Sequence, residues 1–212
     1  GVALVDIGST LSSLSIFYNG TILFTKIIPL GGNMITNDIS RIFSLSKADS
    51  ERVKIINGQL IEELENSLSI IEVDALGNDN DSVEITRKDL ISVIKPRVKE
   101  IINTLKEQVL ESGYNHLIAN RVVITGGASQ MDGLINITST IIEKRARLGK
   151  SNVIKGIPEN MRSSSFSAIN SLLTYSIINN NEISVRNNIK SNNSGGLYIY
   201  LIKFKNWILE NF

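Results

Sequence analysis

The first part of the chain alternates between short apolar runs and turn residues. Residues 2–6, 12–18 and 21–29 are apolar or alternate between apolar and polar positions, and Asn19-Gly20 separates the last two runs. A period of two is typical of β-strands, and Asn-Gly is a strong signal for a tight hairpin turn. The chain is therefore predicted to begin as a three-stranded antiparallel unit.

Helical spacing replaces this alternation after residue 33. Apolar residues recur three and four positions apart between Met34 and Phe43, and residues 46–57 form a second helical pattern. Residues 69–74 and 82–85 are then typical of short strands. Two helices followed by two strands are predicted for this part of the chain.

A long helix is predicted to begin near residue 86. Thr86 followed by Asp89 is typical of a helix N-cap, and a stripe of apolar residues follows at helical spacing. The stripe comprises Leu90, Ile94, Val98, Ile101, Leu105 and Val109. Pro96 lies inside this pattern, so it must either kink the helix or start a new one.

Strands and helices continue to alternate beyond residue 120. The predicted elements are a buried strand at 121–125, a helix at 134–144, a short strand at 152–157 and a helix at 163–178. Strands at both ends of the folded region, with a more helical segment between them, are typical of an interrupted α/β fold.

We therefore divide the chain into a lobe and an insertion. The lobe is predicted to combine residues 1–45 with residues 121–178, and residues 46–120 are predicted to form an inserted α+β subdomain. Residues 179–196 are polar and rich in asparagine, which is typical of a flexible linker.

The last sixteen residues, 197–212, are predicted to form an amphipathic helix. Its apolar side and border consist of Leu197, Tyr200, Leu201, Phe204, Trp207, Ile208 and Phe212, while Lys203, Asn206 and Glu210 lie on the far side. The segment is too short to span a bilayer, and a helix of this kind favours the membrane interface. The predicted membrane residues are Leu197, Leu201, Phe204, Trp207, Ile208 and Phe212. The alternative is a terminal helix docked into a groove of its own domain.

Composition narrows the possible chemistry. Twenty-two basic and 21 acidic residues leave a net charge of +1, so no electrostatic attraction to nucleic acid is expected. The chain has no cysteine and one histidine, which excludes disulfides, thiol catalysis and the usual zinc clusters. No secretion signal is recognisable, so a cytoplasmic setting is expected. The chain begins at Gly1 inside a predicted strand, which suggests a piece of something longer.

Two glycine-containing turns are candidate ligand sites. Asp6-Ile7-Gly8 lies at a predicted hairpin, where backbone amides can bind phosphate and the carboxylate can hold a magnesium-bound water. Gly126-Gly127-Ala128 follows a predicted strand and precedes a helix, so the backbone can approach a ligand closely. Each motif also has a purely structural alternative, because such turns are common for steric reasons.

Four segments together resemble the FtsA family of bacterial cell-division proteins, within the actin and sugar-kinase ATPase superfamily. The segments are GVALVDIGS, KIIPLGGNMITNDIS, RVVITGGASQMDGL and the ending KNWILENF, in the same order and at similar spacing. The resemblance covers nearly the whole chain but lacks the family's N-terminal half. It implies an actin-like (ribonuclease H-like) lobe with an inserted α+β subdomain and a C-terminal amphipathic helix.

The resemblance also implies a role and partners. Proteins of this family bind the C-terminal tail of the tubulin-like protein FtsZ and tie it to the cytoplasmic face of the inner membrane at the division site. The chain is therefore expected to bind FtsZ and membrane lipids, to self-associate in an actin-like manner and to meet other division proteins. A small-molecule kinase of the same superfamily, or an actin-like adaptor of pilus or secretion systems, is the alternative.

The family's cofactors are ATP and Mg²⁺, and the resemblance assigns residues to them. The nucleotide-binding positions implied are Asp6, Gly8, Gly32, Asn33, Glu51, Lys54, Gly126, Gly127 and Ala128, with Asp6 also implied as the metal site. Glu51 and Lys54 could equally form a surface ion pair on a helix. Asp38 is expected near the same cleft or in the first turn of its helix, where it would complement the helix dipole.

The phosphate hairpin departs from the family pattern. FtsA relatives usually read Asp-Ile-Gly-Gly-Gly-Thr-x-Asp, whereas residues 6–13 here read DIGSTLSS. Side chains at Ser9 and Thr10 restrict a turn that glycine leaves free, and Leu11 has no hydroxyl group. We therefore expect an adaptor without enzymatic turnover, and weak or no ATP binding by this chain alone.

The segment IKPRVKE at residues 94–100 resembles the family's helix that binds the FtsZ tail. The resemblance implies that Arg97 pairs with a carboxylate of the tail and that Glu100 fixes its register. The alternative is that Arg97, Lys99 and Glu100 are only the solvated face of an amphipathic helix.

Overall fold

A five-stranded mixed sheet forms the centre of the fold. In this computed structural model, residues 1–61, 68–74, 82–149 and 156–178 are described. The sheet has the strand order β3-β2-β1-β6-β7. Its members are β1 (Val2–Ile7), β2 (Ser12–Tyr18), β3 (Thr21–Ile28), β6 (Val122–Thr125) and β7 (Ala146–Leu148). β1, β2 and β3 pair antiparallel, which confirms the predicted N-terminal unit, and β6 pairs parallel with β1 and β7.

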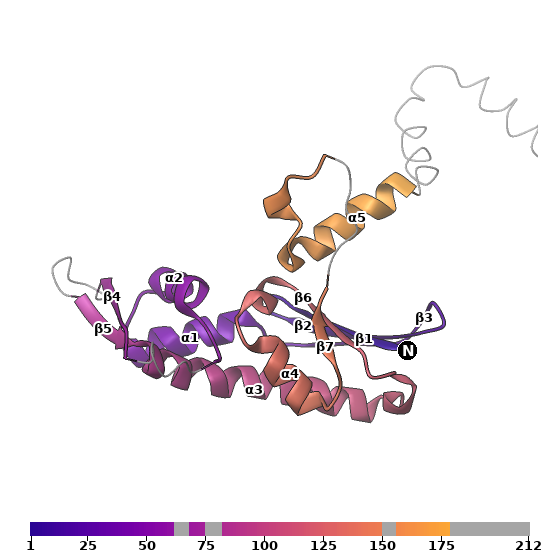
Figure 1. Ribbon diagram of the computed structural model, residues 1–212, viewed down its shortest axis with the longest axis horizontal. Helices are drawn as coiled ribbons and strands as arrows, with labels where there is room; N and C mark the ends of the chain where they lie inside the picture. The colour runs from indigo at the N-terminus through magenta and orange to yellow at the C-terminus, as the bar shows by residue number, and fades with distance from the viewer. Residues whose placement is uncertain (62–67, 75–81, 150–155, 179–212) are drawn as a thin grey trace, which may run out of the picture. The chain divides into compact units, whose positions relative to one another are not determined.

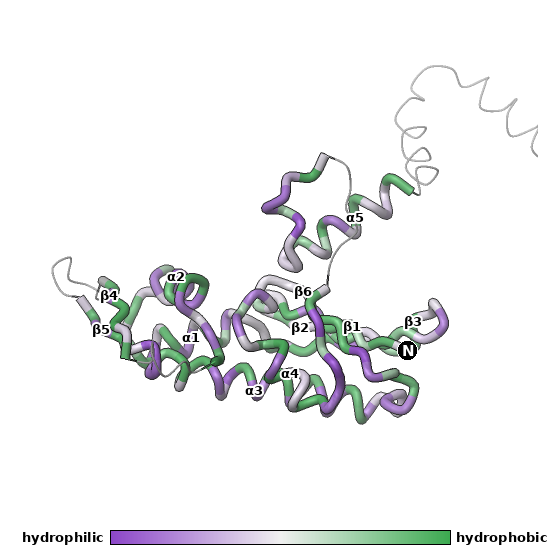
Figure 2. The backbone as a smooth tube through the Cα atoms, in the orientation of Figure 1, coloured by the Kyte–Doolittle hydropathy of each residue, from purple (hydrophilic) through white to green (hydrophobic). Residues whose placement is uncertain are grey.

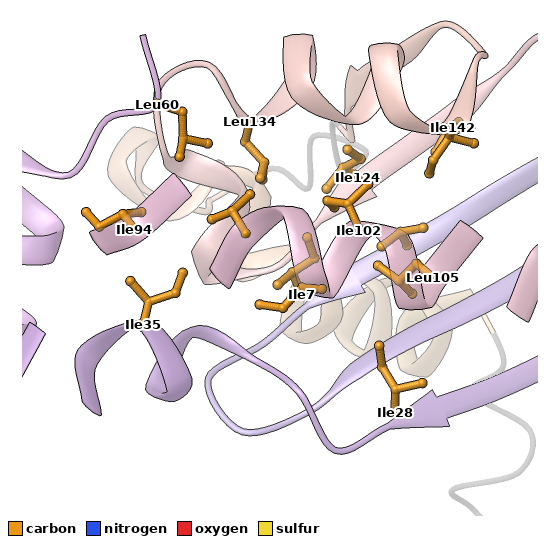
Figure 3. Packing of buried hydrophobic residues seen from close by; sticks show 14 of the residues in the cluster. Ile7, Ile28, Ile35, Leu60, Ile94, Ile102, Leu105, Ile124, Leu134 and Ile142 are labelled. Carbon is orange, nitrogen blue, oxygen red and sulfur yellow. The ribbon is translucent and has the colours of Figure 1, made fainter. Parts of the chain in front are cut away.

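Helices cover one face of this sheet. Alternate residues of β1, namely Ala3, Val5 and Ile7, are buried on that face. Helices α3 (Arg87–Glu111) and α4 (Leu134–Ile142) lie along this face (Figure 1). Their side chains pack with those of β1 in one hydrophobic cluster (Figure 3). Figure 2 shows hydrophobic residues concentrated along β1 and alternating with hydrophilic residues along α3. Burial of this alternating pattern is what holds the helices against the sheet.

Helix α3 agrees closely with its sequence pattern. Its N-cap is Thr86, whose side chain accepts a hydrogen bond from the Asp89 amide at 3.1 Å. All six residues of the predicted apolar stripe are buried. The helix is continuous through Pro96, so this proline does not start a new helix. The same helix runs along the five-stranded sheet (Figure 1).

The region between the two parts of the lobe contains its own small sheet. Strands β4 (Ile70–Asp74) and β5 (Ser82–Thr86) pair antiparallel, separately from the five-stranded sheet. Helix α1 (Gly32–Phe43) precedes this region, and α2 (Lys47–Asn57) begins it with Ser46 as its N-cap. Helix α1 packs against both α2 and α3. The boundaries 46 and 120 of the inserted subdomain stay a prediction.

The C-terminal part differs from the sequence prediction in three places. Helix α4 ends at Ile142, because Glu143 adopts a left-handed conformation with φ +59°. The short strand β7 was not predicted, whereas most of the strand predicted at 152–157 lies outside the described residues. The helix predicted at 163–178 is a 3₁₀ turn at Ser164–Phe166 followed by α5 (Ser167–Ile178).

The chain divides into two compact units. The first is Gly1–Asn170, which contains both sheets, and the second is Ser171–Phe212. The predicted linker 179–196 and membrane helix 197–212 lie outside the described residues. Among the helices that the structure describes, none is both long and apolar enough to cross a bilayer.

Candidate functional site

A pocket of about 390 Å³ lies where the two glycine-containing turns meet helix α2. It brings together six of the nine predicted nucleotide-binding residues from four separate parts of the sequence. These six are Gly8, Gly32, Glu51, Lys54, Gly127 and Ala128. Asp6, Asn33 and Gly126 do not line the pocket. Asn33 and Gly126 are adjacent in sequence to residues that do, and Asp6 lies two residues before Gly8.

The turn between β1 and β2 is bound to the start of α1. The Gly32 amide donates to the Gly8 carbonyl at 2.9 Å, and the Asn33 amide donates to the Ser9 carbonyl at 2.7 Å. The Ser9 hydroxyl donates to Asn33 Oδ1 at 2.6 Å. A Cβ atom at Gly31 would lie 2.6 Å from the Ser9 carbonyl oxygen, so only glycine permits this close approach. Asn33 therefore holds Ser9, which lines the pocket, in place through two hydrogen bonds.

Gly126 holds the second turn against strand β1. It has φ +92°, and a Cβ atom there would lie 2.4 Å from the Ile7 carbonyl oxygen. Its amide donates to the Ser164 carbonyl at 3.2 Å. The next residue, Gly127, faces open space, because a Cβ atom there would meet nothing within 4 Å. The two glycines thus have different roles. Gly126 permits close packing of the turn against β1, and Gly127 leaves the pocket open.

Lys54 and Glu51 form an ion pair on the wall of the pocket. Lys54 Nζ lies 2.6 Å from Glu51 Oε2 and also donates to Thr36 Oγ1 at 2.9 Å and to the Gly32 carbonyl at 3.2 Å. The Lys54 side chain is 10% exposed and that of Glu51 is 41% exposed. The two residues do form the i,i+3 ion pair of the alternative interpretation. However, Lys54 does not lie on the surface, because its side chain points inward toward the start of α1.

This pairing changes the acidity of Glu51. Burial alone would raise the pKa of its carboxyl group, but hydrogen bonds from Lys54 and Thr36 and the positive charge of Lys54 outweigh burial. The pKa of Glu51 is therefore below its ordinary value, and the group is ionised at neutral pH. Lys54 and ionised Glu51 thus place a paired positive and negative charge on the pocket wall.

Asp6 lies beside the pocket and is engaged by the neighbouring strand. Thr125 Oγ1 donates to Asp6 Oδ2 at 2.8 Å, across the parallel pair β1 and β6. Among the described residues, no three Asp, Glu or His side chains gather as a metal site would require. Mg²⁺ is often bound through one carboxylate, waters and substrate phosphates, and the second Asp6 oxygen suits such a role. The residues thus permit phosphate-bound Mg²⁺ but offer no cage of their own.

Several pocket residues were missed by the sequence analysis. The additional lining residues are Ser9, Ile55, Ile56, Gly58, Gln130, Met131, Asp132 and Ser165. Ile55 and Ile56 lie in the last turn of α2 and are each 71% exposed. Their adjacent positions gave no signal of this exposure, because Ile101 and Ile102 are also adjacent and are both buried in α3. One side of the pocket is thus an uncovered apolar surface.

Arg97 lies on α3 and binds two carboxylates of its own chain. Its Nε and Nη2 atoms donate to Asp38 Oδ2 and Oδ1 at 2.6 and 3.2 Å, and Nη1 donates to Glu100. These hydrogen bonds to Asp38, together with both carboxylate charges, outweigh burial and raise the pKa of Arg97. Asp38 was expected near the nucleotide cleft or in the first turn of its helix. The first-turn expectation is wrong, because Asp38 lies in the second turn of α1; Asp38 is not among the residues that line the pocket.

The six predicted membrane residues lie outside the described residues. Leu197, Leu201, Phe204, Trp207, Ile208 and Phe212 therefore stay a prediction from the sequence.

The mixed sheet, the small second sheet and the pocket between two turns define an actin-like ATPase fold. Two solved structures share it at low sequence identity. MreB5 of Spiroplasma citri bound to ADP is 16% identical with a TM-score of 0.62, covering 90% of this chain and 56% of that one. The PilM–PilN type IV pilus biogenesis complex is 17% identical with a TM-score of 0.58, covering 80% of this chain and 44% of that one. At such identity these likenesses establish the fold alone.

The sequence comparisons are more specific. Residues 3–171 match the family described as "Cell division protein FtsA", and the chain belongs to this family. FtsA of Pseudomonas aeruginosa is 30% identical, over 100% of this chain and 51% of its own length. FtsA of Agrobacterium fabrum is 28% identical, over 82% of this chain and 40% of its own. FtsA of Escherichia coli is 29% identical, over 82% of this chain and 43% of its own length. The chain thus spans about half or less of these relatives.

Family membership confirms the predicted resemblance and the actin-like fold class, and it supports a role in cell division. It also decides against the kinase and pilus-adaptor alternatives as the family of this chain.

Proposed function

We propose that this chain is the C-terminal portion of an adaptor that ties FtsZ filaments to the cytoplasmic face of the membrane at the division site. The observation that carries the proposal is the family match over residues 3–171, together with the Pseudomonas aeruginosa relative that aligns over the whole chain, tail included. An adaptor needs one surface for its partner and another for the membrane, and each has a candidate here.

The candidate partner surface is the face of α3 that carries Arg97 and Glu100. The Arg97 side chain is 21% exposed and that of Glu100 is 51% exposed, so both can be reached from solvent. Arginine recognises carboxylates through its planar fork of N–H groups. In this proposal Arg97 binds an acidic residue of the FtsZ tail, and Glu100 fixes the register of the peptide.

The candidate membrane surface is the amphipathic segment 197–212, attached through residues 179–196. Several large apolar side chains on one stripe favour the lipid interface, and lipid binding supplies the attachment point. In this proposal the linker lets the folded lobe move relative to the membrane. Other division proteins are expected as further partners.

The pocket is proposed as one half of a nucleotide site whose other half lies on another lobe. Its open apolar side at Ile55 and Ile56 supports this, because a complete ligand pocket covers most of the ligand. Glu51 and Lys54 are proposed to lie beside the ligand's base and sugar, and Gly8 near its phosphates. Bound ATP with Mg²⁺ near Asp6 would supply the charge that orders this cleft for actin-like self-association.

A recruitment assay tests the tethering function directly. Vesicles containing anionic lipid are mixed with this chain and a fluorescent peptide from the C-terminus of the same organism's FtsZ, and the pelleted fluorescence is measured. Tethering requires that the vesicles carry the peptide down only when the chain is present, and that deletion of residues 197–212 abolishes this. Equal peptide in the pellet with and without the chain would refute the proposal.

A further inference from the structure

The guanidinium of Arg97 is already occupied in the free chain. The Nε and Nη2 edge binds both oxygens of Asp38, and Nη1 binds Glu100. This edge of an arginine is one of the two that can hold a carboxylate in a bidentate pair. An incoming carboxylate therefore cannot take that geometry on this edge while Asp38 remains in place.

The charges around Arg97 also cancel. Arg41 Nη2 lies 3.6 Å from Asp38 Oδ1, so the cluster contains two guanidinium groups and two carboxylates. Their formal charges sum to zero, and a neutral cluster exerts little long-range attraction on an acidic peptide. The arginine needed for recognition is present, but its charge is compensated within the chain.

The pair lies where an exchange of partners is feasible. The side chains of Arg97 and Asp38 are 21% and 14% exposed, so both reach the surface without being fully solvated. Asp38 belongs to α1 and Arg97 to α3, 59 residues apart in sequence. The contact therefore depends on how these two helices pack.

We propose that Asp38 masks Arg97 in the free protein and that an acidic peptide binds this surface by displacing the Asp38 carboxylate. This inference rests on the proposed partner function, in which a carboxylate binds at Arg97. A purely structural pair makes the opposite prediction. If Asp38 only held Arg97 in its binding position, removing its charge would weaken peptide binding instead of strengthening it.

The experiment compares the full chain with its Asp38→Asn variant in binding a fluorescent FtsZ C-terminal peptide, by anisotropy. Asp38→Asn keeps the side-chain shape and leaves the cluster with a net positive charge, so binding is expected to tighten by about fivefold. Glu107→Gln is the matched control, because it removes one exposed carboxylate from α3, the helix of Arg97, away from the cluster. The double variant Asp38→Asn with Arg97→Gln tests whether the gain acts through Arg97. Thermal unfolding shows whether each variant is folded. If the Asp38→Asn variant is not folded, Asp38→Ala is measured in its place.

Each outcome has one meaning. Tighter binding by Asp38→Asn that disappears in the double variant supports the mask, as does binding seen only after Asp38→Asn. Unchanged or weaker binding by Asp38→Asn overturns the mask while leaving the partner function intact. An equal gain from Glu107→Gln also overturns it, since the effect would then be general charge. Absence of binding by both the unmodified chain and the variant overturns the mask and the partner function together.

Discussion

Gly126 lies directly against Ile7, so close that a Cβ atom on the glycine would be 2.4 Å from the Ile7 carbonyl oxygen. Its φ of +92° is also a conformation that other residues rarely adopt. This contact joins the turn after β6 to the strand β1 that leads into the phosphate hairpin. Two distant glycine motifs of the sequence are thereby held at one pocket.

Replacing Gly126 with alanine is therefore expected to destabilise the fold. The positive φ and the clash with backbone together should lower the free energy of unfolding by at least about 2 kcal/mol. Gly127→Ala is the matched control, because a Cβ atom there meets nothing within 4 Å and should change stability little. Urea denaturation measures both variants. Equal effects of the two substitutions would contradict this account of the turn.

The sequence alone predicts those helices and strands that are decided by neighbouring residues. The period-two runs and Asn19-Gly20 predict the N-terminal strands, and the cap at Thr86 with its apolar stripe predicts α3, because neighbouring residues decide these elements. Strand β7 has three residues, which is too short for any period to be recognised.

The candidate site was predictable only in part, because some of its contacts join residues that are distant in the sequence. Gly8 and Gly127 belong to two recognisable turn motifs, whereas Gly32, Glu51 and Lys54 were assigned to the site only through the family resemblance. The pairing of Asp38 with Arg97 links residues 59 apart, and the packing of two helices decides it. Ile55 and Ile56 are apolar, so the sequence alone would place them in the core. Only the fold shows that they are exposed at the pocket.

The pKa of Glu51 gives a prediction for acid stability. Because the folded-state pKa is lowered, ionised Glu51 stabilises the fold at pH values above its ordinary pKa of 4.5. This contribution is lost as the pH falls from that value through the lower folded-state pKa. Carbon-13 NMR of the Glu51 carboxyl should give a titration midpoint below 4.5. Lys54→Met should move the midpoint upward, and an unmoved midpoint would show that Lys54 is not the cause.

Partner binding should depend on Arg97 more than on its exposed neighbour Lys99. A charge-assisted hydrogen bond to a carboxylate contributes roughly 1.5 to 3 kcal/mol, so Arg97→Glu should weaken the FtsZ-peptide complex by tenfold or more. Lys99→Glu makes the same charge change two positions away, on a different side of α3. Anisotropy with the labelled peptide measures both. Equal losses would indicate nonspecific attraction instead of a defined contact.

Arg97→Glu also removes the ion pair with Asp38 and brings three carboxylates together. The unfolding transition of this variant must therefore be measured alongside its binding. Arg97→Gln, which avoids the repulsion, should still bind the peptide less tightly than Lys99→Gln.

Membrane attachment should depend on the apolar stripe of residues 197–212. Burying a large side chain contributes about 1.5 to 3 kcal/mol before ordering costs, so the stripe suffices for reversible binding to lipid. Trp207→Glu places a charge at the edge of the inserted face and should remove most of the binding to anionic vesicles in a flotation assay. Asn206→Glu is the control, since it adds the same charge on the far side of the helix. Flotation unchanged by Trp207→Glu or by deletion from Leu197 would refute the anchor.

This chain alone is expected not to bind ATP measurably. The pocket has one open apolar side at Ile55 and Ile56, and the side chains of Ser9 and Thr10 restrict the turn of the phosphate hairpin. A half-covered ligand gains too little contact to offset the entropy lost on binding. Isothermal titration calorimetry with ATP and Mg²⁺ should therefore show no heat of binding. Micromolar affinity that is lost in Gly127→Val, whose side chain would extend into the open space at residue 127, would show that this single lobe forms a complete nucleotide site.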